Sequence, residues 1–324
     1  MSKTPFLIVG LVGLAALLAY AHDAQAQVDG QAGSANLPFT VAETGQSYPL
    51  LAQAVGAIGD GQGTILIRPG LYAQCAVQQG GDIIYRAAAI GQVVFDKTTC
   101  EGKAALVLRG RSARIDGIIF QGMAVPDGNG AGIRLEKGGL KVTRSIFRNS
   151  EQGILTAVDP EAGIEIDQST FSGLGRCDRG LDCAHGIYIG NYGSLTVTNS
   201  RFERGNGGHY IKSRAARVDI RGNAFDDSRG RTTNYMIDLP GGASGVISEN
   251  EFVQGKNKEN HSALITVAPE GKQRSSAGLS VTNNDASIAP GVDWSTVFLA
   301  DWSGDAVKLG VNRLGRGLKP FERR

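Results

Sequence analysis

The sequence has almost no charge imbalance, few prolines and few aromatic residues, and these shortages argue against several classes of protein. A formal net charge of +2 over 324 residues is too small to suggest a nucleic-acid-binding protein. After residue 20, no stretch is apolar enough to span a bilayer. The 10 prolines accompany 46 glycines without low-complexity tracts, which indicates many tight turns and not disorder. Aromatic residues make up 6%, which disfavours a binding module built on aromatic platforms for sugars.

Cysteine and histidine are also scarce, with four residues of each. The chain has no C-x-x-C motif and no clustered Cys/His spacing, which argues against a zinc site. An even number of cysteines in an exported chain favours disulfides. We expect Cys177 and Cys183 to close the short loop CDRGLDC, and Cys75 and Cys100 to be joined across neighbouring coils of the repeat described below.

Residues 1–26 have the layout of a secretory signal. Lys3 supplies a positive start, residues 6–20 (FLIVGLVGLAALLAY) form an uncharged apolar run, and AQA at 24–26 is a small-x-small cleavage site. The run is shorter than the roughly 20 residues of a spanning helix, and an uncleaved anchor is the alternative. We therefore expect a periplasmic or secreted protein that is not held in the membrane after cleavage before Gln27, and that is a monomer.

A short motif that ends in phenylalanine recurs through the middle of the chain. Its copies read IDGIIF, VTRSIF, IDQSTF, VTNSRF, IRGNAF and ISENEF, and their phenylalanines are 27, 24, 31, 23 and 27 residues apart. Such a period marks a solenoid, a propeller or a repeat array. The segments are β-branched and alternate with period two, which excludes helical repeats, and each repeat is too short for a four-stranded propeller blade. We predict coils of two or three short strands, each pairing in parallel with its equivalent about 4.8 Å away.

This arrangement assigns structural roles to the repeated residues. The phenylalanines should form one internal ladder, comprising Phe120, Phe147, Phe171, Phe202, Phe225 and Phe252. Asn199, Asn223 and Asn250 lie at the turns, where asparagine tolerates a left-handed backbone and can bond along the stack. Roughly ten coils follow from the period.

The ends of the repeat define the expected domain boundaries. An open end of a β-helix exposes apolar core and unpaired strand edge, so it needs a cap. The segment from Ser47 to Ile58 has the apolar spacing of an amphipathic helix and is the expected cap. We expect an N-terminal segment at 27–46, the β-helix domain at 47–310, and a solvated basic tail at 311–324.

The stretch AVGAIGDGQGTILIRPGLY resembles the opening of pectate-lyase-like proteins, in which a helix precedes a Gly-Asp turn and a strand ending in Pro-Gly-x-Tyr. With the repeats, the resemblance covers roughly residues 39–290. It implies an all-β fold, namely a single-stranded right-handed parallel β-helix solenoid with an N-terminal capping helix. This fold carries lyases, hydrolases, epimerases, esterases and phage tailspikes, so the resemblance alone does not fix an activity.

The segment Gly208–Arg214 (GHYIKSR) carries the strongest candidates for chemistry. If Ile211 points inward, then Tyr210, Lys212 and Arg214 share the outer face. Aligning the repeats on a central isoleucine pairs Ile189, Ile211, Ile237 and Ile265. This alignment places Gly190 and Asp238 beside Lys212, with Tyr188 and Tyr210 in the adjacent row and His185 at the edge.

These residue types suit an acidic polysaccharide. Arginine or lysine binds a uronate carboxylate, and neutralising that carboxylate makes the adjacent C–H proton acidic. We therefore expect Lys212, oriented by Asp238, to be the base, Arg214 to neutralise the carboxylate, and His185 or Tyr188 to be the acid. Substrate-binding candidates are Tyr188, Tyr210, His209 and His261. His261, which ends the loop GKNKENH, and Glu270 after it are candidates for a wall of the cleft. The structural alternative is a cross-strand ladder of ion pairs worth a few tenths of a kcal/mol.

A second resemblance concerns HGIYIG at 185–190 and IKSR at 211–214, which are similar to the His-Gly and Arg-x-Lys elements of polygalacturonases. The order of Arg and Lys is reversed, and the family's Asn-Thr-Asp and paired Asp-Asp elements are not matched, so glycoside hydrolysis of that kind is not expected. Lyases of the β-helix fold often place calcium on the substrate carboxylate, so calcium is a candidate cofactor. Asp178 with Asp182, or Asp226 with Asp227, would supply oxygens.

The resulting hypothesis is an exported enzyme that acts on a uronate-containing polysaccharide by β-elimination or C5-epimerisation. The alternatives are a non-catalytic glycan-binding protein and a structural cell-surface solenoid. Convergence of polar groups over the strands between residues 185 and 270 would favour the enzyme.

Overall fold

The computed structural model describes residues 1–2 and 37–324 of the chain. The expected signal and its cleavage site fall on residues 3–36, outside the described residues. Within the described part, no helix is long and apolar enough to cross a membrane.

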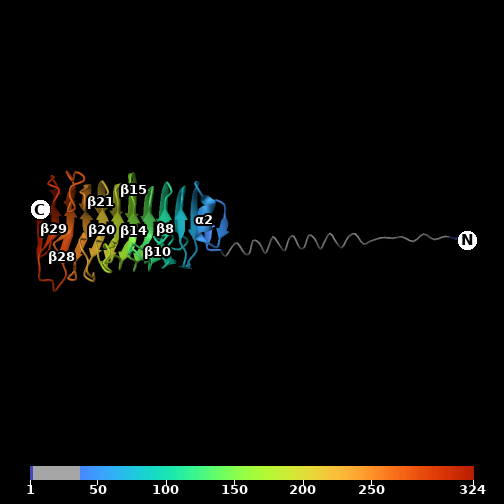
Figure 1. The fold of residues 1–324 in the computed structure, drawn as a ribbon, viewed down its shortest axis with the longest axis horizontal. Coiled ribbons are helices and arrows are strands. Elements are labelled where there is room, and N and C mark those ends of the chain that lie inside the picture. Colours follow the sequence, from blue (N-terminus) through green and yellow to red (C-terminus); the bar gives the residue numbers. More distant parts are fainter. Residues whose placement is uncertain (3–36) are drawn as a thin grey trace.

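Three long sheets, made almost entirely of parallel strands, run side by side along one axis (Figure 1). In spatial order, sheet A contains β2 (Gln46–Tyr48), β1 (Phe39–Val41), β3 (Gln62–Ile67), β6 (Asp82–Ala87), β9 (Ser112–Asp116), β12 (Gly139–Thr143), β15 (Asp159–Asp167), β18 (Tyr192–Thr198), β21 (Arg217–Arg221), β24 (Ser244–Ser248), β27 (Ser280–Thr282) and β30 (Lys308–Leu309). Sheet B contains β31 (Arg313–Leu314), β28 (Asp285–Ile288), β25 (Glu251–Gln254), β22 (Ala224–Asp226), β19 (Arg201–Glu203), β16 (Thr170–Ser172), β13 (Ile146–Arg148), β10 (Ile118–Gln121), β7 (Val93–Asp96) and β4 (Gly70–Tyr72). Sheet C contains β32 (Leu318–Arg323), β29 (Thr296–Asp301), β26 (Ala263–Val267), β23 (Ile237–Leu239), β20 (Ile211–Ser213), β17 (Ile187–Ile189), β14 (Gln152–Thr156), β11 (Ala131–Leu135), β8 (Ala104–Leu108) and β5 (Ala76–Gln78).

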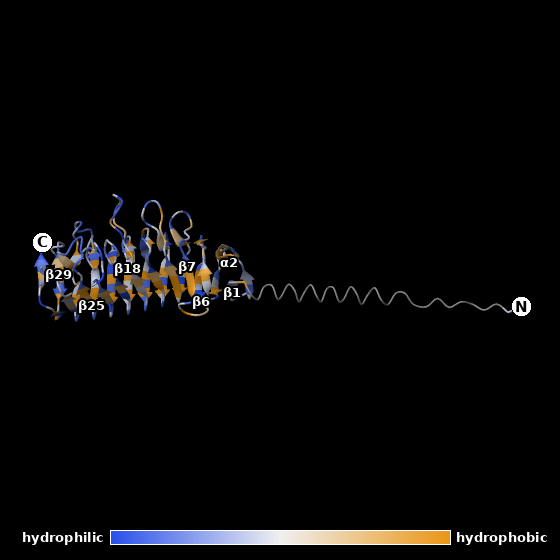
Figure 2. Ribbon diagram, turned by 90° about the horizontal axis from the view of Figure 1, so that it is seen from below, coloured by the Kyte–Doolittle hydropathy of each residue, from blue (hydrophilic) through white to orange (hydrophobic). Residues whose placement is uncertain are grey.

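From β3 onward, the chain visits sheets A, B and C in turn, so each coil supplies one strand to each sheet. This is the right-handed parallel β-helix that the repeat and the resemblance predict. Apolar side chains alternate into the interior, and hydrophilic loops project mainly from one side (Figure 2).

The predicted phenylalanine ladder is confirmed on the inner face of sheet B, and it begins one coil earlier than expected, at Phe95. Consecutive rings from Phe95 to Phe252 stack with centroids 4.8–5.8 Å apart. Strand pairing puts each phenylalanine level with its neighbour, because coils of different length absorb their extra residues in loops and not in the strands. The ladder fixes sheet B relative to the rest of the core.

The corner between sheets A and B uses asparagine in two ways. Asn199 adopts a left-handed backbone with φ of 48°, as expected for a sharp corner. Asn223 and Asn250 instead form an internal ladder, in which Nδ2 of Asn223 donates to Oδ1 of Asn250 over 2.9 Å. Asn250 donates in the same way to Asn284 over 3.0 Å. The ladder therefore satisfies polar groups buried at the corner.

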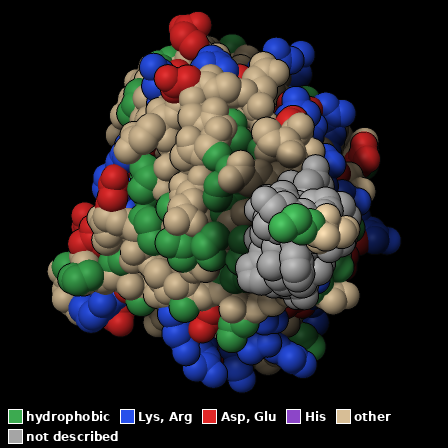
Figure 3. Space-filling model, turned by 90° about the vertical axis from the view of Figure 1, so that its right-hand side faces the viewer, with side chains coloured by type: hydrophobic (Ala, Val, Ile, Leu, Met, Phe, Trp, Pro, Cys, Tyr) green, Lys and Arg blue, Asp and Glu red, His purple; other side chains and the backbone are tan. Residues whose placement is uncertain are grey.

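A single helix among the described residues, α2 (Leu51–Ile58), covers the N-terminal end together with the antiparallel pair β1 and β2. The helix starts later than the expected Ser47, because residues 46–48 form β2 and Pro49 favours an extended residue before it. Seen from this end, charged side chains lie mainly around the rim, and the end face is largely hydrophobic or uncharged (Figure 3). The expected cap is present, and residues 39–46 contribute to it.

The C-terminal residues correct one expectation. Residues 311–324 are not a solvated tail, because β31 and β32 continue sheets B and C in parallel. Leu314 and Leu318 are half-buried against the core, and pairing with β28 and β29 holds this segment on the last coil despite its basic charge.

Candidate functional site

Three strands of sheet C bring Tyr188, Lys212 and Asp238 into one row on the outer face of the solenoid. Lys212 pairs with Tyr188 on one side and with Asp238 on the other. The alignment of the repeats predicted Asp238 beside Lys212, and this is confirmed. It predicted Gly190 on the opposite side of Lys212, where the structure has Tyr188. Ile187, and not Ile189, is level with Ile211. A slip of two residues leaves the inward and outward faces unchanged, so alternation alone does not detect it.

Lys212 and Arg214 both bind one carboxylate, that of Glu270. Nζ of Lys212 lies 2.6 Å from Oε1 of Glu270, and Nη2 of Arg214 lies 2.5 Å from Oε2. Arg214 also donates from Nε to the hydroxyl of Tyr188 over 3.2 Å. Partial burial opposes ionisation of Glu270, but the hydrogen bonds from Lys212 and Arg214 outweigh it and lower the pKa of this carboxyl. Lys212 of this row and the nearby Arg214 therefore form a pair that binds one carboxylate.

Asp238 occupies a different environment, with its residue only 2% exposed. Its Oδ1 accepts a hydrogen bond from Thr266 over 2.8 Å, and its Oδ2 lies 3.5 Å from Nζ of Lys212. Burial raises the pKa of Asp238, although Lys212 and Thr266 act in the opposite direction. Asp238 thus lies beneath Lys212, where it can orient the amine.

His185 and His209 stack on each other with ring centroids 4.9 Å apart, and His209 stacks on Tyr235. Nδ1 of His185 accepts from the backbone N–H of His209, and Nδ1 of His209 accepts from that of Tyr235. Burial lowers the pKa of His185 to about 3 and that of His209 well below its usual value. Since a neutral imidazole with an accepting Nδ1 carries its proton on Nε2, both rings are neutral Nε2–H donors. The Nε2 of His209 lies 3.5 Å from Oδ2 of Asp238.

A pocket of about 290 Å³ opens beside the row, lined by Asp182, Cys183, His185, Tyr188, Gly208, His209, Lys212, Asn234 and Glu259. One wall is the loop closed by the disulfide Cys177–Cys183, whose Cα atoms are 4.4 Å apart. The second predicted disulfide, Cys75–Cys100, is also present and joins the coils of β5 and β8. Polar groups from four coils therefore converge on this face.

Two of the expected substrate-binding residues lie elsewhere. Tyr210 does not point outward, because it precedes the first residue of β20 and its side chain turns into the core, where its residue is 3% exposed. Its hydroxyl donates to Asp227 over 2.7 Å. His261 stacks against Trp294 with centroids 4.7 Å apart and does not line the pocket.

Comparison with known proteins places the chain in a family. The family model described as the right handed beta helix region matches residues 104–289. The protein belongs to this right-handed β-helix family. No curated protein matches its sequence.

Two solved structures are similar to this β-helix protein. One is AlyGC, an alginate lyase of the PL6 family, at 16% identity and a TM-score of 0.49, with 80% of this chain and 40% of that chain covered. The other is ORF18 of Geobacillus virus E2, at 15% identity and a TM-score of 0.52, with 83% and 55% covered. The match thus spans about half of the length of these two proteins or less. Likeness at such identities concerns the fold alone.

Three of the four carboxylates considered for calcium are paired with cations in this β-helix. Asp178 pairs with Arg176, Asp226 with Arg201, and the buried Asp227 with Lys258 at 3.0 Å. Among the described residues, one group of three metal-ligating side chains comes together, Cys177, Cys183 and Glu259, and its two cysteines are joined in the disulfide. Calcium requires six to eight oxygens, so these residues do not fit it.

The pair of Lys258 and Asp227 is the buried support of the pocket wall. Both side chains are at most 1% exposed, and Nζ of Lys258 also donates to the backbone oxygen of Asn234. Thr233 and Tyr210 donate to the same aspartate. The network ties three successive loops of the β-helix together. The sequence did not predict it, because Lys258 lies in a polar loop and belongs to no repeated motif.

Proposed function

We propose that this β-helix protein acts on a uronate-containing polysaccharide by removing the proton next to the sugar carboxylate. The observation that carries the proposal is the pair of bonds from Lys212 and Arg214 to one carboxylate, beside the hydroxyl of Tyr188. Glu270 marks the position that a substrate carboxylate would take. Binding a carboxylate to a cation such as Arg214 also makes the neighbouring C–H proton more acidic, and Lys212 lies beside that position.

In the proposed reaction, the uronate carboxylate replaces Glu270 on Arg214. Unprotonated Lys212 takes the proton from C5, the C–H electrons form a C4–C5 double bond, and the C4–O bond breaks. Tyr188 gives its hydroxyl proton to the leaving oxygen, since its own oxygen already accepts from Arg214. Transfer of a proton from Lys212 to Tyr188 then restores both groups. Epimerisation would share the first step and return a proton to the opposite face of C5.

Two neighbours act as positioning residues in this scheme. Asp238 holds the amine of Lys212 from below, at 3.5 Å. His185 is neutral, and its Nδ1 accepts from the backbone of His209. Its Nε2–H can therefore donate to a sugar oxygen in the pocket. The role of acid therefore falls to Tyr188 and not to His185, because a buried neutral Nε2–H is a hydrogen-bond donor and a poor proton donor.

Export to the periplasm or the exterior is part of the proposal. Two disulfides are consistent with an oxidising compartment, where acidic polysaccharides are found. One observation favours the second candidate, a non-catalytic glycan-binding or structural solenoid. Glu270 already binds both Lys212 and Arg214, as in an ion-pair ladder that serves only the fold.

A panel of polymers tests the proposal. The purified protein is incubated with alginate, pectate and other uronate polymers, with and without calcium, and with a neutral polymer as control. Unsaturated uronate is followed by ultraviolet absorbance, and inversion at C5 by NMR. Elimination or inversion on one acidic polymer, absent in Lys212→Ala/Arg214→Ala, supports the proposal. No product from any acidic polymer would leave the binding or structural alternative.

A further inference from the structure

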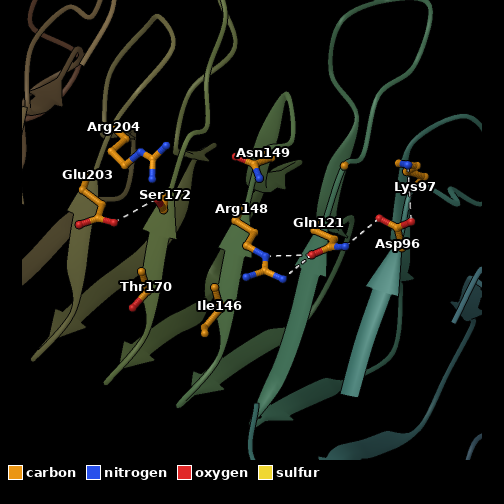
Figure 4. Close-up of a pocket in the computed structure, with 11 residues that line it drawn as sticks. Asp96, Lys97, Gln121, Ile146, Arg148, Asn149, Thr170, Ser172, Glu203 and Arg204 are labelled. Carbon is orange, nitrogen blue, oxygen red and sulfur yellow. Dashed lines mark hydrogen bonds and ion pairs between the residues drawn. The ribbon is translucent and has the colours of Figure 1, made fainter. Parts of the chain in front are cut away.

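A second hollow lies on a different face of the solenoid, along the outside of sheet B. This sheet-B groove has a volume of about 550 Å³ and runs across β7, β10, β13, β16 and β19 (Figure 4). One of its rows follows strand pairing and contains Asp96, Gln121, Arg148, Ser172 and Glu203. The groove is therefore parallel to the axis and crosses five coils.

A second row is built by left-handed residues that directly follow these strands. Lys97, Asn149 and Arg204 have φ of 53–57° and alternate with Gly122 and Gly173. A Cβ on Gly173 would lie 2.6 Å from Oδ1 of Asn149, and one on Gly122 would lie 2.8 Å from Cγ of Lys97. The glycines thus leave room for the three long polar side chains, which stand along the groove (Figure 4).

The charges of the groove are not balanced within the protein. Asp96 pairs with Lys97 at 3.9 Å, and Glu203 pairs with Arg201 at 2.6 Å. The guanidinium of Arg148 bonds only the neutral amide oxygen of Gln121, at 2.8 and 2.6 Å. Within residues 37–324, the side chain of Arg204 has no hydrogen bond and no ion pair. Two guanidinium groups therefore face the groove without a carboxylate.

We propose that the sheet-B groove binds a linear acidic polysaccharide lying along the solenoid axis. Arg148 and Arg204 belong to coils two apart, which separates them by roughly 9–10 Å, twice the strand spacing. Each guanidinium can bind a carboxylate in a bidentate manner, and the side-chain amide of Asn149 stands between them for a sugar hydroxyl. Gln121 and Ser172 bond to their neighbours in the row and keep those neighbours in place. A groove without an aromatic lining residue has no stacking platform for the bases of a single-stranded nucleic acid.

This site is separate from the row on sheet C and goes beyond the proposed function. It would hold the polymer on one face of the solenoid while another stretch of the same polymer reaches the other face. Binding to it does not require that the row on sheet C be catalytic.

The test measures binding of a short oligouronate by calorimetry in the Lys212→Ala/Arg214→Ala protein, so that the residual binding reports the sheet-B groove. Replacing Arg148 and Arg204 by glutamine in this background removes both charges but keeps amide donors. We expect about a tenfold loss of affinity for each arginine removed. Arg221→Gln, which removes an arginine paired with Asp219 on sheet A, should leave binding unchanged.

Four results would each overturn the assignment. The first two are no residual binding in the background protein and equal binding after the two arginines are replaced. The others are equal binding of a neutral oligosaccharide of the same length and equally tight binding of inorganic phosphate. Because the background protein lacks the proposed catalytic cations, a failure of turnover on sheet C does not affect this measurement.

Discussion

The carboxylate of Glu270 lies 2.6 Å from Nζ of Lys212, which precedes it by 58 residues in the chain. The side chain of Lys212 is 12% exposed and that of Glu270 is 42% exposed, so the acid sits at the mouth of the row and the amine within it. A substrate carboxylate must displace Glu270 to reach Arg214 and to free the amine of Lys212. Glu270 is therefore an internal competitor in the proposed reaction.

Replacing Glu270 by glutamine should lower KM for the uronate polymer several-fold, because the neutral amide competes less well for Lys212 and Arg214. The readout is KM and kcat measured separately. Glu165→Gln, which removes the acid paired with exposed Lys141 on sheet A, is the matched control. An unchanged or higher KM in Glu270→Gln would contradict the competitor role.

His185 should make the fold sensitive to acid. Its pKa in the folded protein is about 3, below the usual 6.5, so the unfolded chain binds the proton more readily between these values. Stability from neutral His185 is complete above pH 6.5 and is lost as the pH falls toward 3. The unfolding free energy of the unchanged protein should therefore fall by roughly 2–3 kcal/mol more than that of His185→Gln when the pH is lowered from 7 to 4.5. This estimate takes 1.36 kcal/mol for each pH unit below 6.5.

Denaturant unfolding of both proteins at the two pH values gives this difference directly. Glutamine can still accept the hydrogen bond from the backbone of His209, so the comparison isolates the titrating group. The same pH-dependent loss in both proteins would show that His185 is not held neutral by burial.

Phe171 should contribute strongly to stability because it stacks on rings both above and below, at 4.9 Å. Phe171→Ala should cost about 3–5 kcal/mol of unfolding free energy, through lost burial and a cavity within the ladder. Phe171→Leu should cost less, since it keeps most of the apolar volume. Urea or guanidinium titration measures both, and an alanine variant with a loss below about 1 kcal/mol would contradict a close-packed ladder.

Sequence alone predicted the coils, the phenylalanine ladder and the disulfide Cys75–Cys100, because each follows from strand alternation and the repeat period. The cap followed from the apolar spacing of a helix, and Cys177–Cys183 from the short loop between the two cysteines. Sequence alone missed the register of Tyr188 against Lys212, since a two-residue slip preserves every inward and outward face. It also placed Tyr210 outward, because the in–out alternation of a strand was assumed for Tyr210, which lies just before β20 begins. Glu270 was seen only as a wall residue, since the turn after β26 that brings it to Lys212 has no periodic signal.

The most direct test of the account compares turnover of a uronate polymer by Lys212→Ala and Lys141→Ala. Both substitutions remove an outward lysine that is ion-paired to a glutamate, at 2.6 Å for Lys212 and 2.7 Å for Lys141. The account predicts that Lys212→Ala lowers kcat at least about 100-fold, the usual scale for a general base, while Lys141→Ala retains full turnover and both remain folded. Full turnover by Lys212→Ala on an identified substrate would contradict the assignment of this row as the catalytic site.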